Sequence, residues 1–185
     1  SYRIIERWII AFVSIIGLII CAIPMLIVAI AIKCESKGPV IFKHKRIGRG
    51  GKEFYCYKFR SMQTTAPKDC ATVALENPEK HLTKVGKVLR KLSLDELPQL
   101  YCCLIGTMSF IGYRPVVLSE KKLNAMREKL GVFDARPGIS GYAQVVGRDD
   151  VYYKNKAIMD AQYVKNATLW WDLKLIFQTV GVALN

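Results

Sequence analysis

The feature that most constrains the fold is an uncharged, apolar segment from Trp8 to Ile32. As one straight helix, its run of about 25 residues would extend roughly 37 Å, enough to cross a hydrocarbon core of about 30 Å. Pro24 interrupts the segment after about 16 apolar residues, too few to cross a bilayer alone. The segment is therefore either one kinked spanning helix or a helix–break–helix that enters and leaves a single leaflet.

Charges on the two sides of this segment favour the second arrangement. Arg3 and Arg7 precede it, and six lysines and arginines follow it between Lys33 and Arg49. The positive-inside rule places both flanks on the cytoplasmic face. We therefore expect a re-entrant membrane unit over residues 1–35, broken at Pro24, and one cytosolic unit over residues 36–185.

Composition agrees with a membrane-associated protein. The net charge is +13 and 51% of the residues are hydrophobic, a combination that is unusual in a soluble domain. Such a chain suits anionic partners: lipid headgroups, nucleotides or nucleic acid. The six cysteines have no C-x-x-C spacing and there are only two histidines, so we expect reduced thiols and no structural zinc site.

The rest of the chain predicts a small hairpin and several helices. Two β-rich runs, residues 40–42 and 54–59, flank a glycine-rich loop. Apolar periodicity predicts helices over residues 81–91, 119–130, 152–165 and from Thr168 onward, and the second of these is charged and expected to be exposed. The tryptophans of the last helix fit either an interfacial anchor or core packing. The predicted fold class is α+β, mainly helical: a re-entrant membrane helix, a small β-hairpin and amphipathic interfacial helices around one cytosolic core.

Two adjacent carboxylates, Asp95 and Glu96, lie where the sequence predicts the start of a helix. Ser93 and Glu96 have the spacing of a capping box, and capping from Asp95 is the alternative, with Pro98 in the first turn. Either arrangement places both carboxylates at a positive helix end. The pair is either a well-capped helix start or a place where Mg²⁺ and a phosphate gather.

Arginines recur in rigid turns. Arg114 lies in a Gly-x-Arg-Pro sequence, Arg136 in Arg-Pro-Gly, and Arg148 follows Gly147. A guanidinium held in such a turn can bind a phosphate through two parallel hydrogen bonds. Together with Lys58 and Arg60, these residues indicate a site for more than one phosphate, although a nucleic-acid backbone could use the same set.

In this order, the motifs resemble the bacterial sugar transferase family, the monotopic phosphoglycosyl transferases. The resemblance covers nearly the whole chain and is specific in combination. It rests on the apolar segment broken at Pro24 and on five motifs: Lys58–Met62, Leu92–Leu100, Met108–Gly112, Arg136–Gly138 and Gly147–Arg148.

The resemblance implies a reaction. Such enzymes move a sugar 1-phosphate from a nucleoside diphosphate sugar, usually a UDP-sugar, to a polyprenyl phosphate such as undecaprenyl phosphate. UMP leaves, and the product starts bacterial glycoconjugate assembly (exopolysaccharide, lipopolysaccharide or capsule) on the cytoplasmic face of the inner membrane. Asp95 would be the nucleophile of a ping-pong mechanism with a covalent phosphosugar intermediate, and Asp95 and Glu96 would hold Mg²⁺.

The resemblance also implies partners and binding residues. Nucleotide sugar, polyprenyl phosphate and inner-membrane lipids would bind, nucleic acid would not, and a homodimer is left open. The expected substrate-binding residues are Lys58, Arg60, Arg90, Arg114, Arg136, Arg148 and Asp160. Where the family commonly has an aspartate this chain has Thr107, and Tyr113 replaces the first proline of Gly-Pro-Arg-Pro, which loosens the turn that aims Arg114.

The alternative is a non-catalytic, membrane-anchored basic module that binds anionic lipid or nucleic acid. Such a module would bind in a salt-dependent way and would not depend on Asp95. It has no use for two carboxylates among fixed arginines.

Overall fold

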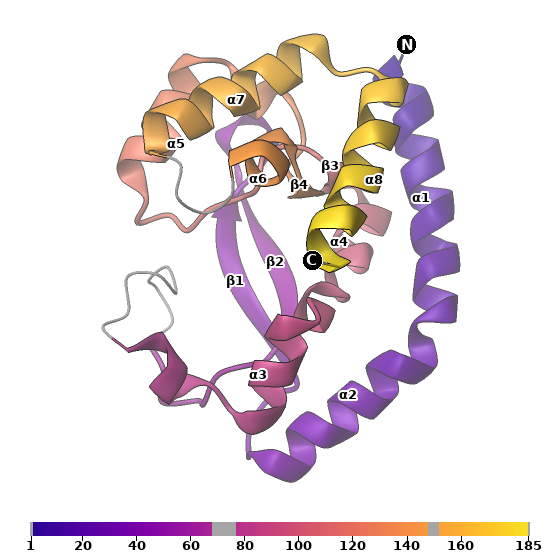
Figure 1. Ribbon diagram of the computed structural model, residues 1–185, viewed down its shortest axis with the longest axis vertical. Coiled ribbons are helices and arrows are strands. Elements are labelled where there is room, and N and C mark those ends of the chain that lie inside the picture. The colour runs from indigo at the N-terminus through magenta and orange to yellow at the C-terminus, as the bar shows by residue number, and fades with distance from the viewer. Residues whose placement is uncertain (1, 68–76, 148–151, 185) are drawn as a thin grey trace.

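A computed structural model describes residues 2–67, 77–147 and 152–184 (Figure 1). It contains eight α-helices: α1 (Tyr2–Ile20), α2 (Ala22–Glu35), α3 (Lys84–Lys91), α4 (Gln99–Ile105), α5 (Lys121–Lys129), α6 (Tyr142–Gly147), α7 (Tyr153–Asn166) and α8 (Leu169–Leu184). Short 3-10 helices are η1 (Arg49–Gly51), η3 (Pro78–His81), η4 (Leu94–Glu96) and η5 (Val132–Asp134). Strands β1 (Ile41–Ile47) and β2 (Glu53–Phe59) form one sheet, and β3 (Ser109–Ile111) and β4 (Gly138–Ser140) another. The predicted mainly helical fold with small sheets is confirmed.

The apolar segment forms the bent pair α1–α2, with a bend of 59°. The break falls at Cys21, three residues before the proline expected to cause it. Pro24 lies in the first turn of α2, where its missing N–H has no helical partner to lose, and its ring excludes a continuous helix through Ile20. Among the described residues no single helix is long and apolar enough to cross a membrane, whereas this bent pair is by length and composition a candidate broken span or re-entrant loop.

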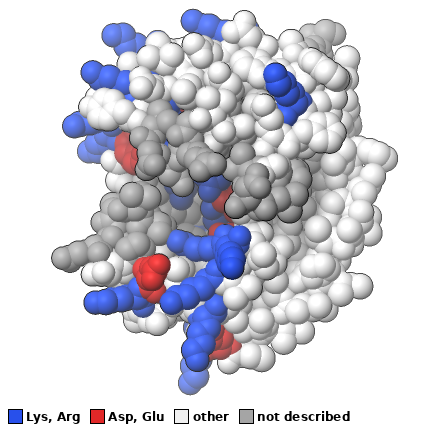
Figure 2. Space-filling model, in the orientation of Figure 1, with Lys and Arg blue, Asp and Glu red and all other residues white. Residues whose placement is uncertain are grey.

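The two faces of α1 have different environments. Ile10 and Ser14 are buried, and Gly17 lies so close to α4 that a Cβ there would approach Leu100 Cδ1 to 3.3 Å. The opposite face exposes Ile4, Ile5, Trp8, Phe12, Ile16 and Ile19. In Figure 1 the pair forms one outer edge of the molecule, and the matching right-hand edge of Figure 2 shows neither blue nor red.

The end of α2 is joined to the start of α3 by hydrogen bonds. The Glu35 carboxylate accepts from the backbone N–H of Lys84 at 2.6 Å and of Val85 at 2.9 Å. Thr83 Oγ1 accepts from Gly86 N–H at 2.9 Å, so α3 has two caps. Behind them, Val28 and Ile32 of α2 pack with Phe59 and Leu89. The α2 end of the apolar pair is therefore fixed to the rest of the molecule.

The predicted hairpin is confirmed as antiparallel β1–β2, with Phe42 opposite Lys58 and Ile47 opposite Glu53. The pair β3–β4 is parallel, and the sequence predicted only a rigid turn where β4 lies. Glycines allow this approach, because a Cβ on Gly138 would lie only 2.2 Å from the backbone N of Gly112. The pairing joins segments far apart in the chain, so no local sequence pattern could predict it.

The C-terminal helices follow the prediction closely, but α5 does not. Trp170 is exposed, as expected for an interfacial anchor. Trp171 packs its ring on Tyr142 and Tyr163, as expected for core packing. Helix α5 was expected to be exposed, yet Leu123, Asn124 and Arg127 are buried. Charged residues surround these three positions in the sequence, so the apolar periodicity did not indicate a buried face of α5.

Replacing Glu35 by alanine tests the α2–α3 junction. We expect Glu35→Ala to lower the free energy of unfolding by about 1 kcal/mol, because two N–H groups at the start of α3 lose their acceptor. Denaturant unfolding in detergent measures the change. Glu128→Ala, which removes an exposed carboxylate from α5, is the control, and an equal effect of both variants would contradict the capping role.

Candidate active site

The turn that presents Asp95 and Glu96 differs from the predicted capping box. Ser93 has φ 54° and its side chain makes no capping hydrogen bond. It is the one non-glycine residue with positive φ in the described part of the chain. Left-handed backbone costs a serine roughly 1–2 kcal/mol, and here it ends α3 and reverses the chain into η4. The alternative cap is also wrong, because Pro98 precedes α4 with no side-chain cap.

Glu96 joins three separate elements. Its Oε1 accepts from Lys58 Nζ of β2 at 2.7 Å and from Arg114 Nη2, in the loop after β3, at 2.6 Å. Burial alone would raise the pKa of Glu96, but Arg114 and Lys58 outweigh burial and lower the pKa to about 2. We call this arrangement the Glu96 bridge.

Asp95 has the opposite environment. Its side chain is buried, and within the described residues its carboxylate accepts no hydrogen bond. Burial raises the pKa of Asp95, with Lys58 and Arg90 opposing the shift and Glu96 adding to it. The two neighbouring carboxylates are therefore different: one is neutralised by cations, and the other is a more basic group beside them.

A buried ion pair holds the backbone of Arg114. Arg127 donates through Nε at 2.9 Å and Nη2 at 2.6 Å to Asp160 Oδ2, and through Nη1 at 3.0 Å to the carbonyl of Arg114. The guanidinium also lies 5.1 Å from the ring centroid of Tyr113, whose ring packs edge-on against Phe133. Tyr113, the residue expected to loosen the turn that aims Arg114, is therefore fully buried beneath that turn.

Among the predicted substrate-binding residues, Lys58, Arg90 and Arg114 surround the dyad. Arg90 Nε donates to Ser61 Oγ at 3.0 Å, and burial lowers the pKa of Arg90 against the attraction of Asp95 and Glu96. Figure 2 shows blue and red side chains close together near the centre of this face.

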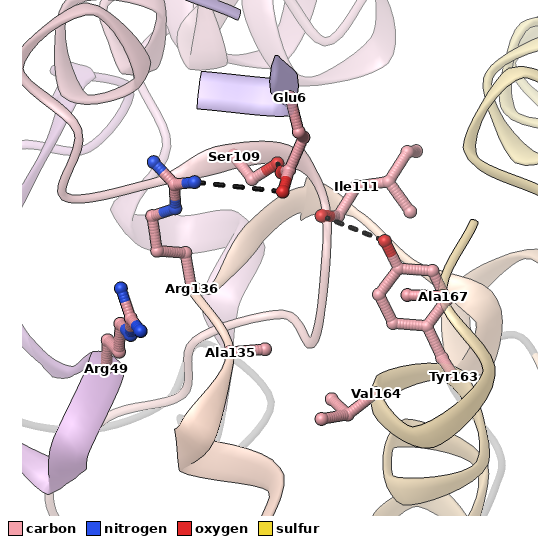
Figure 3. Close-up of a pocket in the computed structure, with 9 residues that line it drawn as sticks. All are labelled: Glu6, Arg49, Ser109, Ile111, Ala135, Arg136, Tyr163, Val164 and Ala167. Atoms are coloured by element: carbon pink, nitrogen blue, oxygen red, sulfur yellow. Dashed lines mark hydrogen bonds and ion pairs between the residues drawn. The ribbon is translucent and has the colours of Figure 1, made fainter. Parts of the chain in front are cut away.

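The other predicted residues lie elsewhere. Arg60 is buried and donates to the carbonyls of Ser36 and Lys37, so it fixes the chain after α2. Asp160 acts on Arg114 through Arg127. Arg136 lies 3.7 Å from Glu6 of α1, beside a cavity of about 30 Å³ (Figure 3). Arg148 lies outside the described residues.

Two cationic residues were not predicted for this site: Arg46, for which the sequence favoured contact with lipid headgroups, and Arg127. Arg46 shares a hairpin face with Lys58, and burial lowers its pKa while Arg114 and Glu96 lie near enough to shift it. The alternation along β1 could have found Arg46. Arg127 gave no such signal, because its buried partner is on α7. At the family's usual acidic position, Thr107 Oγ1 donates to the carbonyl of Cys102 at 3.1 Å, a structural contact at the end of α4.

The dyad has the chemistry of a shared magnesium site. The described residues contain no cluster of three or more histidine, cysteine or carboxylate side chains. Mg²⁺ does not need one, because it commonly binds through one or two carboxylates together with substrate phosphates. Asp95 fits that pattern, and so does Glu96 Oε2, whose one hydrogen bond within the described residues comes from Arg114 Nη1 at 3.4 Å.

Comparison with known proteins identifies the family. The family model for bacterial sugar transferases matches residues 1–185. The chain therefore belongs to the bacterial sugar transferase family, and both the predicted family and the predicted enzyme class, a transferase, are confirmed.

Three relatives illustrate the similarity. The chain is 38% identical over 189 residues to the undecaprenyl-phosphate galactose phosphotransferase of Salmonella typhimurium, covering 90% of this chain and 39% of that protein. It is 40% identical over 175 residues to the UDP-glucose:undecaprenyl-phosphate glucose-1-phosphate transferase of Klebsiella pneumoniae, covering 91% and 37%. It is 38% identical over 171 residues to the exopolysaccharide production protein ExoY of Rhizobium meliloti, covering 84% and 74%. The chain thus spans about two fifths of the length of the first two proteins.

Breaking the Arg127–Asp160 pair should be severe. We expect Asp160→Asn to lower the free energy of unfolding by about 3–5 kcal/mol, because it leaves a buried guanidinium without its counter-ion. The double variant Arg127→Met with Asp160→Leu should recover much of that stability but lose the contact to the Arg114 carbonyl. Denaturant unfolding checks both, and a loss below about 1 kcal/mol for Asp160→Asn would rule out the pair as a main support.

The Glu96 bridge should depend on pH. Because the folded-state pKa of Glu96 is about 2, below its ordinary 4.5, the bridge contributes fully above pH 4.5 and is lost as pH falls towards 2. We expect wild type to exceed Glu96→Gln by about 2–3 kcal/mol in unfolding free energy at neutral pH, allowing for solvent screening at the partly exposed Arg114. The difference should shrink across that pH window in denaturant titrations. A difference that stays constant would contradict the bridge.

Proposed function

We propose that the chain transfers a sugar 1-phosphate from a UDP-sugar to undecaprenyl phosphate, releasing UMP, with Asp95 as the nucleophile. The observation that supports this best is the asymmetry of the dyad. Glu96 is committed to Lys58 and Arg114, whereas Asp95 is buried, more basic and engaged by no hydrogen bond within the described residues. A more basic carboxylate is the better nucleophile, so the electrostatics favour Asp95 for covalent catalysis.

The proposed reaction has two successive phosphoryl-transfer steps. First, a carboxylate oxygen of Asp95 attacks the sugar-bearing phosphorus, and the bond from that phosphorus to the bridging oxygen breaks as UMP departs. Second, an oxygen of the polyprenyl phosphate attacks the same phosphorus and the bond to Asp95 breaks, which restores the carboxylate and forms the polyprenyl diphosphate sugar. Splitting the transfer lets a water-soluble donor and a lipid acceptor react in turn at one site.

Both steps bring anions together, and cations must offset their repulsion. Lys58, Arg90 and Arg114 surround Asp95 closely enough to oppose the upward shift of its pKa. Arg114 offers a planar fork to the equatorial oxygens of the transferred phosphoryl group, and the Arg127 contact holds its backbone in place. We propose that Asp95 and Glu96 hold Mg²⁺ with the donor diphosphate, where the ion supplies charge neutralisation.

The relatives' names support both substrates. Those of the Salmonella and Klebsiella proteins include undecaprenyl phosphate, and the Klebsiella name includes UDP-glucose as the donor. The names differ in their sugar, galactose in one case and glucose in the other. We therefore propose the carrier lipid and the UDP moiety, and leave the sugar to a substrate panel.

The bent pair supports a re-entrant position in one leaflet of the bacterial inner membrane, with the site on the cytoplasmic face. Helices of 19 and 14 residues joined at 59° put the bend about 12 Å below the line through their ends. That depth is slightly less than one leaflet of a hydrocarbon core of about 30 Å. In this position Lys58 and the dyad lie near the headgroups, where the phosphate of a carrier lipid also lies.

Substituting Asp95 tests the proposed nucleophile. We expect Asp95→Asn to reduce UMP release at least about 1,000-fold, because the amide cannot attack phosphorus. The same variant should be as stable as wild type or more stable at neutral pH, since it removes a buried charge whose pKa is raised by burial. UMP formation and thermal unfolding are measured on one preparation, with Glu128→Gln as the exposed control. Substantial UMP release by a folded Asp95→Asn protein would contradict the mechanism.

A further inference from the structure

An open pocket lies at the start of α1. It has a volume of about 410 Å³ and is lined by Ile4, Arg7, Trp8, Arg49 and Arg136. That volume is within the range of about 300–1,000 Å³ typical of small-molecule sites. Three of the five lining residues are arginines, so the pocket selects for an anion.

Backbone and side-chain contacts fix these arginines in place. Arg7 donates through Nη2 to the carbonyl of Leu104 at 2.5 Å, and Arg49 donates through Nε to the carbonyl of Asp134 at 3.2 Å. Arg136 is 3.7 Å from Glu6, the nearby carboxylate, which also accepts from Ser109 Oγ at 2.8 Å. Figure 3 shows Arg49 and Arg136 on the same side of the adjoining cavity, opposite Tyr163 and Val164. The residues that line the two cavities thus include three arginines and one carboxylate, that of Glu6.

The remaining wall of the pocket is apolar and continuous with the exposed face of α1. Trp8 is 73% exposed and Ile4 is 66% exposed, on the face that continues through Ile5 and Phe12. A cationic base beside an apolar wall matches a ligand that has both a phosphate and an acyl chain. Tryptophan at such a boundary is typical of the membrane interface.

This pocket is separate from the dyad. Lys58 lies opposite Phe42 near one end of the hairpin, and Arg49 lies beyond Ile47 at its tip. At about 3.3 Å per residue, roughly 20 Å of strand lies between the two sites. An acceptor phosphate bound at Arg49 would therefore not reach Asp95.

We propose that this pocket binds the phosphate of an anionic membrane phospholipid, with Arg7, Arg49 and Arg136 around the phosphate and an acyl chain along Ile4 and Trp8. The bound lipid joins α1, the hairpin tip and the segment before β4 at the level of the headgroups. It sets the depth and rotation of α1 in the leaflet. This role is independent of the transfer chemistry at Asp95.

The test uses the whole protein in phosphatidylcholine nanodiscs with an increasing fraction of phosphatidylglycerol, read by the thermal midpoint. We expect a saturable rise of the midpoint for wild type, because a ligand that binds the native state stabilises it. Arg49→Gln should need about tenfold more phosphatidylglycerol for half of the rise, as expected for one lost charge-assisted hydrogen bond. Arg49→Lys, which keeps the charge, should lie between the two.

Lys52→Gln is the matched control, because it removes one exposed cation from the same hairpin outside the pocket. It should change the half-saturating fraction by less than about twofold. Equal effects of Arg49→Gln and Lys52→Gln would mean unspecific surface attraction and overturn the proposal, as would no saturable rise in wild type. Inorganic phosphate at matched ionic strength should not reproduce the rise; if it does, the pocket takes free phosphate and the lipid assignment is wrong.

Discussion

The structure of the site depends on the Glu96 bridge. One carboxylate oxygen holds Lys58 from the hairpin and Arg114 from the loop after β3, at 2.7 and 2.6 Å. A partly buried carboxylate needs such partners, because removing a charge from water without compensation costs several kcal/mol. The bridge therefore does two things. It draws together segments that are 38 and 18 residues from Glu96 in sequence, and it leaves Asp95 as the carboxylate that no cation of the described residues binds directly.

The surrounding structure keeps the bridge in position. The left-handed Ser93 turns the chain so that η4 faces β2, and buried Arg127 holds the Arg114 carbonyl. On the side of the apolar pair, the Glu35 cap joins α2 to α3, whose end leads directly into this turn. Arg7 ties α1 to the end of α4 through the Leu104 carbonyl. The apolar pair and the dyad are thus linked through short, rigid connections, which suits the proposed transfer to a lipid phosphate.

Much of this could be predicted from the sequence, and the exceptions have a common cause. The hairpin, the helices α7 and α8, the family and the prominence of Asp95 and Glu96 followed from local patterns and ordered motifs. The capping box failed because Glu96 gains more from Lys58 and Arg114 than from the backbone N–H of Ser93. The parallel β3–β4 pair, the buried Arg127 and the engagement of Arg60 with the carbonyls after α2 all depend on partners distant in sequence. Local periodicity contains no information about such contacts.

The most direct test of the central claim is isotope exchange without the acceptor. With UDP-sugar, Mg²⁺ and radiolabelled UMP but no polyprenyl phosphate, a covalent intermediate on Asp95 lets labelled UMP re-enter the donor. The account predicts that label appears in UDP-sugar with wild type and is absent with Asp95→Asn. Exchange that requires polyprenyl phosphate would show direct transfer between the two substrates and would contradict the two-step mechanism.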